Sequence, residues 1–361
     1  MNNAAIRQAE PAARADWRQW ARSVGSNFLV RRLAKALFTI FFVTSLLFFL
    51  IRLMPSNPLD IFISELISQY SMSYEDARSQ AASMFSIDLD APLWKQYLNY
   101  LADLSRADLG MSLRSVGTPV ISIIRQFLPW TLFSVGIGLL LSFSIGVALG
   151  MVMAYRRDSW LDNILSIFAS VTTSIAPFLL GIMIIVFVAV QWRLINFADL
   201  RGSTSPGIKP GFNLAFIADI FKHAALPIGT YVLTTVGYWM LSMRNSTMAT
   251  LGEDYVTVAR ARGLSDGRIA TAYVGRNAAL PLVTQFALTL ANVIGGAAVI
   301  ERLYSYQGLG AQLVTSVIQR DYSVMQGIFL ILTISVVVAN LVTDLCYGFL
   351  DPRIRVGGDQ T

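Results

Sequence analysis

The stretch EDYVTVARARGLSDGRIATAYVGRNAALP, residues Glu253–Pro281, is a polar segment that lies between two strongly apolar segments. It contains four arginines: Arg260, Arg262, Arg268 and Arg276. Charged side chains are rare inside a bilayer because removing them from water is costly. We therefore interpret this stretch as an aqueous loop between two membrane spans. A loop this long, basic and helix-forming predicts a docking surface for a protein on the cytoplasmic side.

The first half of the loop is predicted to be a short helix, Asp254–Arg262, that stops at Gly263. Glycine suits the left-handed residue that ends a helix, and Leu264 can make the apolar contact that follows such an end. Ser265 suits the N-cap of the next helix, which would pass into a membrane span at Pro281. One side of the first helix would carry Tyr255, Val258, Ala259 and Arg262, and the small Ala259 and Ala261 would permit close docking.

Composition agrees with a membrane protein. Of the 361 residues 55% are hydrophobic and 14% are charged, whereas soluble domains carry about a quarter charged residues. The net charge of +6 is spread over loops between apolar runs, which argues against nucleic-acid binding. A single cysteine, Cys346, and a single histidine, His223, exclude a disulfide within the chain and cysteine or histidine metal clusters. We expect no metal and no cofactor.

The sequence also indicates no enzyme. It has no Gly-Lys dipeptide, so the phosphate-binding pattern GxxxxGK[ST] is absent. No GxSxG occurs, so the common motif of a serine nucleophile is absent as well. One acid, Asp344, is predicted at membrane depth, where a functional role is the default hypothesis. Pairing with Arg353, Arg355 or a neighbouring helix is the alternative.

A membrane-spanning helix needs about 20 mostly apolar residues, and six segments of the chain satisfy this requirement. They are Leu33–Met54, Trp130–Tyr155, a span within Asn163–Trp192, Ala224–Met243, Leu282–Ile300 and Val324–Tyr347. Pro177 in the third segment predicts a kink or a tilt. The expected fold class is thus an all-α polytopic membrane protein with six transmembrane helices.

Six spans place both termini on one side of the membrane. The arginine-rich N-terminus, the turn at Arg156 and Arg157, and the tail all carry positive charge on that side, so it is predicted to be cytoplasmic. The loop between residues 193 and 223 opposes this assignment, because it carries four Lys and Arg residues on the predicted outside. The expected layout is a cytoplasmic extension (1–32), a first transmembrane helix (33–54), an extracytoplasmic segment (55–129), a five-helix core (130–347) containing the loop 253–281, and a cytoplasmic tail (348–361).

Two further patterns concern packing. Gly138, Ser142, Gly146 and Gly150 recur every four residues along the second span. Small side chains let membrane helices approach closely, so we expect helix packing here, with lining of a permeation path as the alternative. In the outer segment Leu93, Tyr97, Leu98 and Leu101 recur at helical spacing, which predicts an amphipathic surface helix.

The segment ARARGLSDGRI, continuing to RNAALP, resembles the cytoplasmic coupling motif of binding-protein-dependent ABC importer permeases. It most resembles the form with a longer glycine-to-proline spacing in the dipeptide, oligopeptide and nickel permease family. Four other segments resemble the first-permease type of that family: VRRLAKALFTIFFVTSLLFFLIRLMPSNP, DAPLWKQYLNYLADLSRADLGMSLR, GGAAVIERLYSYQGLGAQLVTSVIQRDYSVMQG and NLVTDLCYGFLDPRIR. The resemblance extends from Val30 to Arg355. PSNP, SYQGLG and the pair Thr257 and Val258 depart from the usual family patterns.

The resemblance implies a type I ABC importer permease fold in a bacterial or archaeal plasma (inner) membrane. The implied partners are a second related permease subunit, two ABC ATPase subunits, an extracytoplasmic solute-binding protein and membrane lipid. ATP hydrolysis would occur in the partners, and the chain would form half of the translocation path. The residues implied to couple to the ATPase are Tyr255, Val258, Ala259, Arg260, Ala261, Arg262, Gly263 and Leu264.

No residue of the sequence identifies the substrate or a substrate-binding site. Peptides are the default expectation within this class, with oligosaccharides or another small solute as the alternative. A channel or a secondary transporter belongs to a different class. It would be expected to show intramembrane charges or an inverted repeat, and neither is clear in the sequence.

Overall fold

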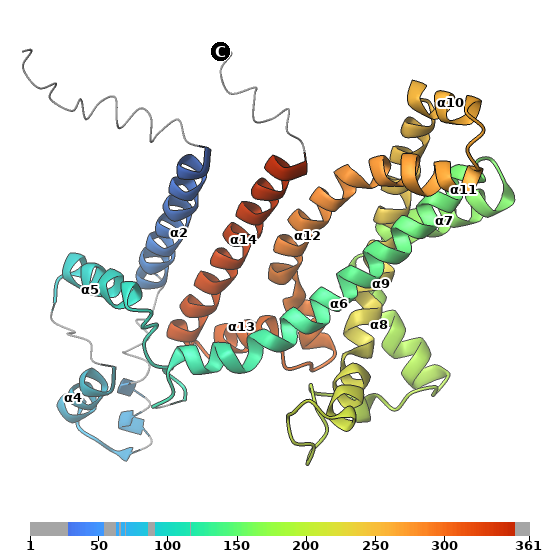
Figure 1. Ribbon diagram of the computed structural model, residues 1–361. Helices are drawn as coiled ribbons and strands as arrows, with labels where there is room; N and C mark the ends of the chain where they lie inside the picture. Colours follow the sequence, from blue (N-terminus) through green and yellow to red (C-terminus); the bar gives the residue numbers. More distant parts are fainter. Residues whose placement is uncertain are drawn as a thin grey trace, which may run out of the picture.

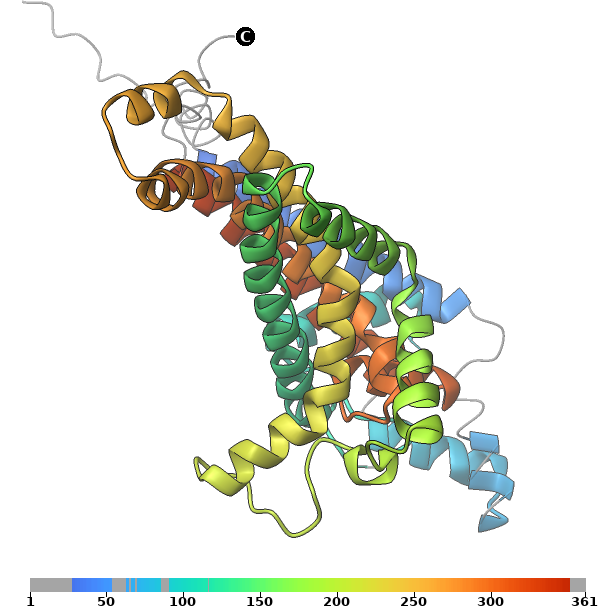
Figure 2. The same cartoon turned by 90° about the vertical axis from the view of Figure 1, so that its right-hand side faces the viewer.

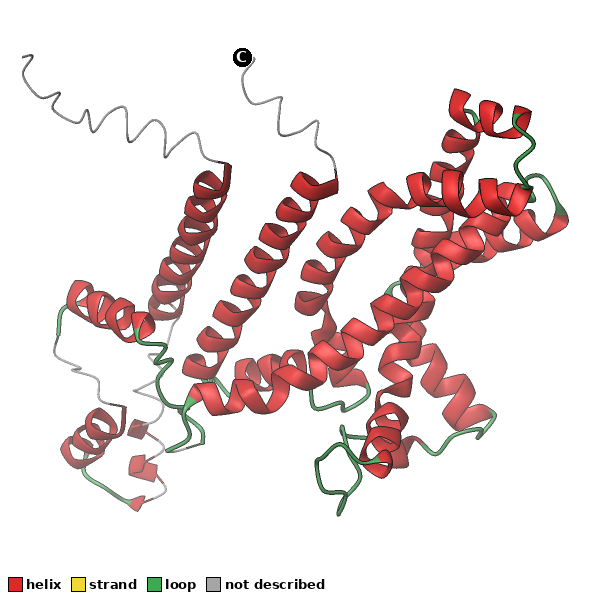
Figure 3. Ribbon diagram, viewed as in Figure 1, coloured by secondary structure: helices red, strands yellow, loops and turns green. Residues whose placement is uncertain are grey.

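The computed structural model describes residues 28–53, 63–64, 66–68, 70–85, 91–115 and 117–350, without the side chains of 28–29, 52, 83–85, 290–296 and 342–350. Over these residues the regular structure is helical (Figure 3), apart from one isolated bridge between Met111 and Pro119. The predicted all-α class is confirmed. Residues 1–27, the tail from 351, the PSNP turn and the Asp344 side chain lie outside this description.

The helices follow one another along the chain as shown in Figure 1. They are α2 (Phe28–Leu53), α4 (Tyr74–Phe85), α5 (Leu93–Ser105), α6 (Val120–Tyr155), α7 (Trp160–Ser174), α8 (Pro177–Ile184), the π-helix η1 (Ile185–Gln191), the 3-10 helix η2 (Phe197–Leu200), α9 (Leu214–Leu251), α10 (Asp254–Ala261), α11 (Asp266–Arg268), the π-helix η3 (Ile269–Gly275), α12 (Arg276–Leu303), α13 (Leu309–Ile318) and α14 (Tyr322–Leu350).

Four helices in the described part of the chain are long and apolar enough to cross a membrane. They span Val30–Ile51, Val120–Tyr155, Leu214–Leu251 and Tyr322–Leu341, and the bent pair α7 and α8–η1 makes five if it is one span. The predicted fifth span, Leu282–Ile300, lies inside α12, which contains the undescribed side chains 290–296. Several apolar helices are therefore present, but the count of six is not confirmed.

Several helices begin earlier than the predicted spans, and α2 and α6 are two examples. The helix α2 begins at Phe28, within the expected extension. The helix α6 begins at Val120 rather than Trp130 and continues through Pro129. Its first turns pack against α13 and α14, where Val120 and Ile124 are buried with Ile328. This tertiary contact extends the helix into the segment that was expected to be an outer loop.

The third predicted span is broken rather than kinked. Its two halves, Trp160–Ser174 and Pro177–Gln191, meet at an angle of 104°. Ala176 has an extended backbone (φ −61°, ψ 137°), and Pro177 is the first residue of α8. A residue before proline avoids the helical conformation, while proline itself suits the first helical position. The local chemistry explains a break here, and packing against other helices sets its angle.

The core of the molecule lies around α6 and α9, which run side by side (Figure 2). Buried residues of α6, α9 and α12 form one cluster with Tyr304 and Tyr306, which follow α12. The predicted amphipathic helix is present as α5. Its Tyr97 packs on Phe48 of α2, with 5.2 Å between ring centroids, while Leu93 and Leu98 stay exposed.

Candidate functional site

The helix α10 lies at one end of the molecule, where the N-terminal end of α2 and the C-terminal end of α14 also lie (Figure 1). It follows α9 after a turn of two residues, Gly252 and Glu253. The Glu253 amide donates to the Thr250 carbonyl oxygen at 3.2 Å, and the Val256 amide donates to the Glu253 carbonyl oxygen at 3.0 Å. Hydrogen bonds on both sides of this tight turn connect the two helices closely.

The end of α10 has the geometry that Gly263 predicts. Gly263 is left-handed, with φ +75°. Its amide donates to the Arg260 carbonyl oxygen at 2.9 Å, and the Leu264 amide donates to the Ala259 carbonyl oxygen at 3.3 Å. These two bonds form the Schellman motif, in which an apolar residue after the glycine packs back onto the helix. Leu264 makes that contact against a cluster that includes Val256.

The exposed face of α10 differs from the predicted one at Ala259. Val256 and Ala259 are buried against Ile269 and Val274 of η3, because residues three apart share one helix face. Ala259 therefore faces its own chain and offers no surface to a partner. The predicted residues that remain exposed are Tyr255, Val258, Arg260, Ala261, Arg262 and Gly263, while Leu264 is half-buried.

The second half of the loop is tied back to the first. Ser265 stands at the N-cap of α11, but its side chain makes no capping hydrogen bond. The π-helix η3 then leads directly into α12, which begins at Arg276 and contains Pro281 within the helix. The Asn277 side-chain amide donates to the Tyr255 hydroxyl at 3.0 Å. A displacement of α10 would therefore shift the first turn of α12 as well as the last turn of α9.

The four small residues of α6 all face α9. A Cβ atom at Gly138 would lie 2.8 Å from the Tyr231 Cβ, and one at Gly146 would overlap the Trp239 Cβ. A Cβ at Gly150 would overlap the Met240 carbonyl oxygen. The Ser142 and Thr235 hydroxyls are hydrogen-bonded at 2.6 Å. These contacts place the ridge in a helix–helix interface.

A buried carboxylate that the sequence did not predict caps α13. Glu301 is fully buried, accepts a hydrogen bond from the Thr131 hydroxyl at 2.5 Å, and accepts another from the Ala311 amide at 3.0 Å. A Cβ on Gly308 would overlap this carboxylate. The glycine in SYQGLG could have signalled a close approach of this kind, but nothing in the sequence identifies Glu301 as its partner.

A cavity of about 430 Å³ is lined partly by residues at the start and along the length of α13, a helix that lies away from α10 (Figure 1). Its lining includes Arg201, Arg302, Gln307 and Gln312. The Arg302 guanidinium donates to the Thr315 hydroxyl at 3.3 Å. The cavity is thus polar and basic, and it is separate from the loop that carries α10.

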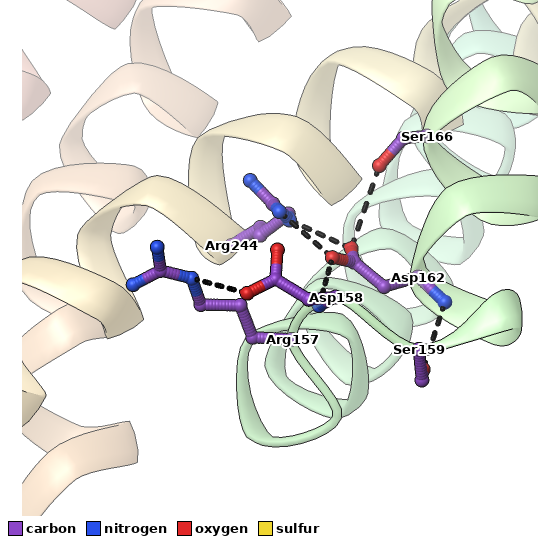
Figure 4. Close-up of polar contacts among 6 residues, drawn as sticks. All are labelled: Arg157, Asp158, Ser159, Asp162, Ser166 and Arg244. Carbon is purple, nitrogen blue, oxygen red and sulfur yellow. Dashed lines mark hydrogen bonds and ion pairs between the residues drawn. The ribbon is translucent and has the colours of Figure 1, made fainter.

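Two charged residues that were not predicted from the sequence also meet. Asp162 of α7 and Arg244 of α9 form a bidentate ion pair close to the turn between α6 and α7 (Figure 4). Arg244 follows the predicted fourth span directly, and Asp162 immediately precedes the third. A charge at the edge of an apolar segment is an ordinary feature of membrane helices, so the sequence contained no signal that these two would pair.

Several helices long and apolar enough to cross a membrane, joined by a short exposed helix at one end, define a polytopic all-α membrane protein. Residues 146–356 match the family described as binding-protein-dependent transport system inner membrane component. The chain belongs to this family, which confirms the family resemblance of its sequence.

Three relatives show how far the similarity extends. The chain is 32% identical over 330 residues to a protein of Brucella suis named as a peptide permease, covering 91% of this chain and 99% of the relative. It is 30% identical over 348 residues to the dipeptide transport system permease protein of Escherichia coli K12, covering 91% and 98%. It is 30% identical over 331 residues to the oligopeptide transport system permease protein of Bacillus subtilis, covering 91% and 99%.

Proposed function

We propose that this chain is the non-catalytic permease subunit of an ATP-driven importer and forms half of a translocation path for peptides. The observation that carries the proposal is the similarity to dipeptide and oligopeptide permeases over 91% of the chain. Its partners would be a second related permease, two ABC ATPase subunits and an extracytoplasmic solute-binding protein. Oligosaccharides remain the alternative substrate class, and no observation favours them over peptides.

The helix α10 is proposed as the element that receives the motion of the ATPase. Its exposed side chains include the apolar Tyr255 and Val258 and the guanidinium groups of Arg260 and Arg262. Arg262 lies on the same side of the helix as Tyr255 and Val258 by its spacing, whereas Arg260 lies on another side. Exposed apolar side chains beside arginine are typical of the centre of a protein interface. Its inner face, Val256 and Ala259, packs on η3, so a force on α10 would reach the base of α12.

The assembled transporter should take up peptides only when ATP is hydrolysed. The expected result is ATP-dependent uptake of labelled di- and tripeptides into proteoliposomes that contain this chain, its second permease and both ATPases, with the solute-binding protein added outside. The purified chain alone should hydrolyse no ATP, because no phosphate-binding loop is present. Uptake that continues without the ATPases would refute the importer, and uptake restricted to oligosaccharides would refute the peptide assignment.

The proposed orientation places both termini and the Glu253–Pro281 loop in the cytoplasm and the 55–129 segment outside. In a Cys346→Ser background, Asp266→Cys should resist a membrane-impermeant thiol reagent applied to intact cells and react after permeabilisation. Trp94→Cys should react in intact cells, since Trp94 is 65% exposed on α5. Labelling of position 266 from outside would reverse the orientation.

A further inference from the structure

The ion pair between Asp162 and Arg244 joins a buried carboxylate to a half-buried guanidinium and is geometrically well formed. The Arg244 Nε and Nη2 atoms donate to Asp162 Oδ1 and Oδ2 at 2.7 and 2.8 Å. The Asp162 side chain is 1% exposed and that of Arg244 is 21% exposed. Two parallel bonds from the planar guanidinium fix orientation as well as distance.

The same carboxylate also holds the turn between α6 and α7 (Figure 4). Asp162 Oδ2 accepts from the Asp158 amide at 3.1 Å, and Oδ1 accepts from the Ser166 hydroxyl at 3.4 Å. The Asp162 amide donates to the Ser159 hydroxyl oxygen at 3.3 Å. One side chain therefore joins the start of α7, the preceding turn and α9.

The end of α6 lies against the same part of α9. A Cβ added to Gly150 would lie 2.8 Å from the Met243 Cβ and 3.1 Å from the Arg244 amide nitrogen. Farther along α9, a Cβ on Gly237 would lie 2.5 Å from the Ala169 carbonyl oxygen of α7. Close packing of this kind sets how near the helices lie. A directional ion pair also resists sliding of one helix along another.

Arg244 stands about two helical turns before Leu251, where α9 ends and the two-residue turn to α10 begins. The helix between these points is continuous. A displacement of α10 would therefore carry Arg244 with it. Through Asp162 the displacement would pass to α7, which leads into the 104° bend with α8.

The contribution of this pair to stability can be separated from any other role. Replacing both members of a buried ion pair by well-packed uncharged residues of similar volume is often tolerated, whereas removing one member leaves an uncompensated charge and is strongly destabilising. The two effects can therefore be separated experimentally. A doubly neutral variant tests what the charges do besides maintaining the fold.

We propose that Asp162 and Arg244 are positioning residues that make the α6–α7 turn and α9 move as one body with α10, so that ATPase motion reaches the bent α7–α8 pair. The proposal rests on the proposed function of α10 as the docking helix. It gives these two residues a role in energy coupling in addition to their role in packing.

The test compares Asp162→Asn, Arg244→Gln and the double variant in the reconstituted complex. Each single change should lower the amount of assembled complex, and the double variant should restore it. Although its assembly is restored, the double variant is expected to transport about tenfold less peptide for each ATP hydrolysed than the wild-type complex. A double variant with normal abundance and a normal ratio of transport to ATP hydrolysis would overturn the proposal.

Two further variants keep the test decisive. Arg244→Lys retains the charge but cannot form the two parallel bonds, so the complex should assemble and show the same loss of coupling. Normal coupling in Arg244→Lys would also overturn the proposal, even if the double variant fails to assemble. Arg157→Gln is the matched control, because its ion pair with Asp158 is largely exposed and such pairs contribute little. A wild-type complex without any ATP-dependent uptake would instead refute the proposed function.

Discussion

Gly263→Val is expected to reduce peptide uptake by the assembled transporter at least tenfold while leaving the abundance of the chain nearly normal. Gly263 has φ +75°, a conformation that costs an L-residue about 1–2 kcal/mol, and a β-branched side chain suits it least. An added Cβ would meet no atom of the chain within 4 Å. The chain can therefore still fold. The substitution changes the backbone conformation at the end of α10, which is the surface that we expect the ATPase to contact.

Two matched variants separate backbone strain from added bulk. Gly263→Asn should retain most activity, because asparagine tolerates the left-handed conformation. Gly267→Val should also be mild, since Gly267 has equally open surroundings but no positive φ. Uptake and substrate-stimulated ATP hydrolysis are measured together in the complex. Normal values of both for Gly263→Val would exclude a coupling role for this end of α10.

Gly146→Ala is expected to cause the largest loss of assembled chain. The added methyl group would overlap the Trp239 Cβ and lie 3.0 Å from the Val236 carbonyl oxygen and 3.2 Å from the Met240 amide nitrogen. Trp239 is completely buried and packed on Phe143, so its side chain cannot shift to make room for the added methyl group. The helices α6 and α9 must move apart, and overpacking of this kind costs about 1–3 kcal/mol.

Gly136→Ala provides the control on the same helix. An added Cβ there meets no atom within 4 Å, and both substitutions gain the same helix propensity of about 1 kcal/mol. The amount of complex extracted in detergent and its melting temperature should fall for Gly146→Ala and be unchanged or higher for Gly136→Ala. Equal behaviour of the two variants would contradict tight packing of α6 on α9.

Several features of this protein follow from short stretches of sequence. The helical class follows from apolar runs of membrane length, since an unpaired backbone cannot be placed in lipid. The helix end at Gly263 was predictable because the left-handed conformation is a property of one residue and its immediate neighbours. A departure from a straight helix at Pro177 was predictable for the same reason, although the expected kink or tilt is a 104° bend between two helices. In each case the cause lies within a few residues of its effect.

The tertiary structure decided the features that depend on distant residues. Ala259 was expected to face a partner, but Ile269 and Val274 of η3 cover it. The pattern of residues along a short helix does not specify which of its sides will pack against a neighbouring segment. The first turns of α6 depend on α14, and the 104° angle after α7 depends on the helices around it. Asp162 and Arg244 meet across 82 positions of sequence. Local patterns specify backbone conformation and polarity, whereas which faces and charges meet is decided only when the helices pack.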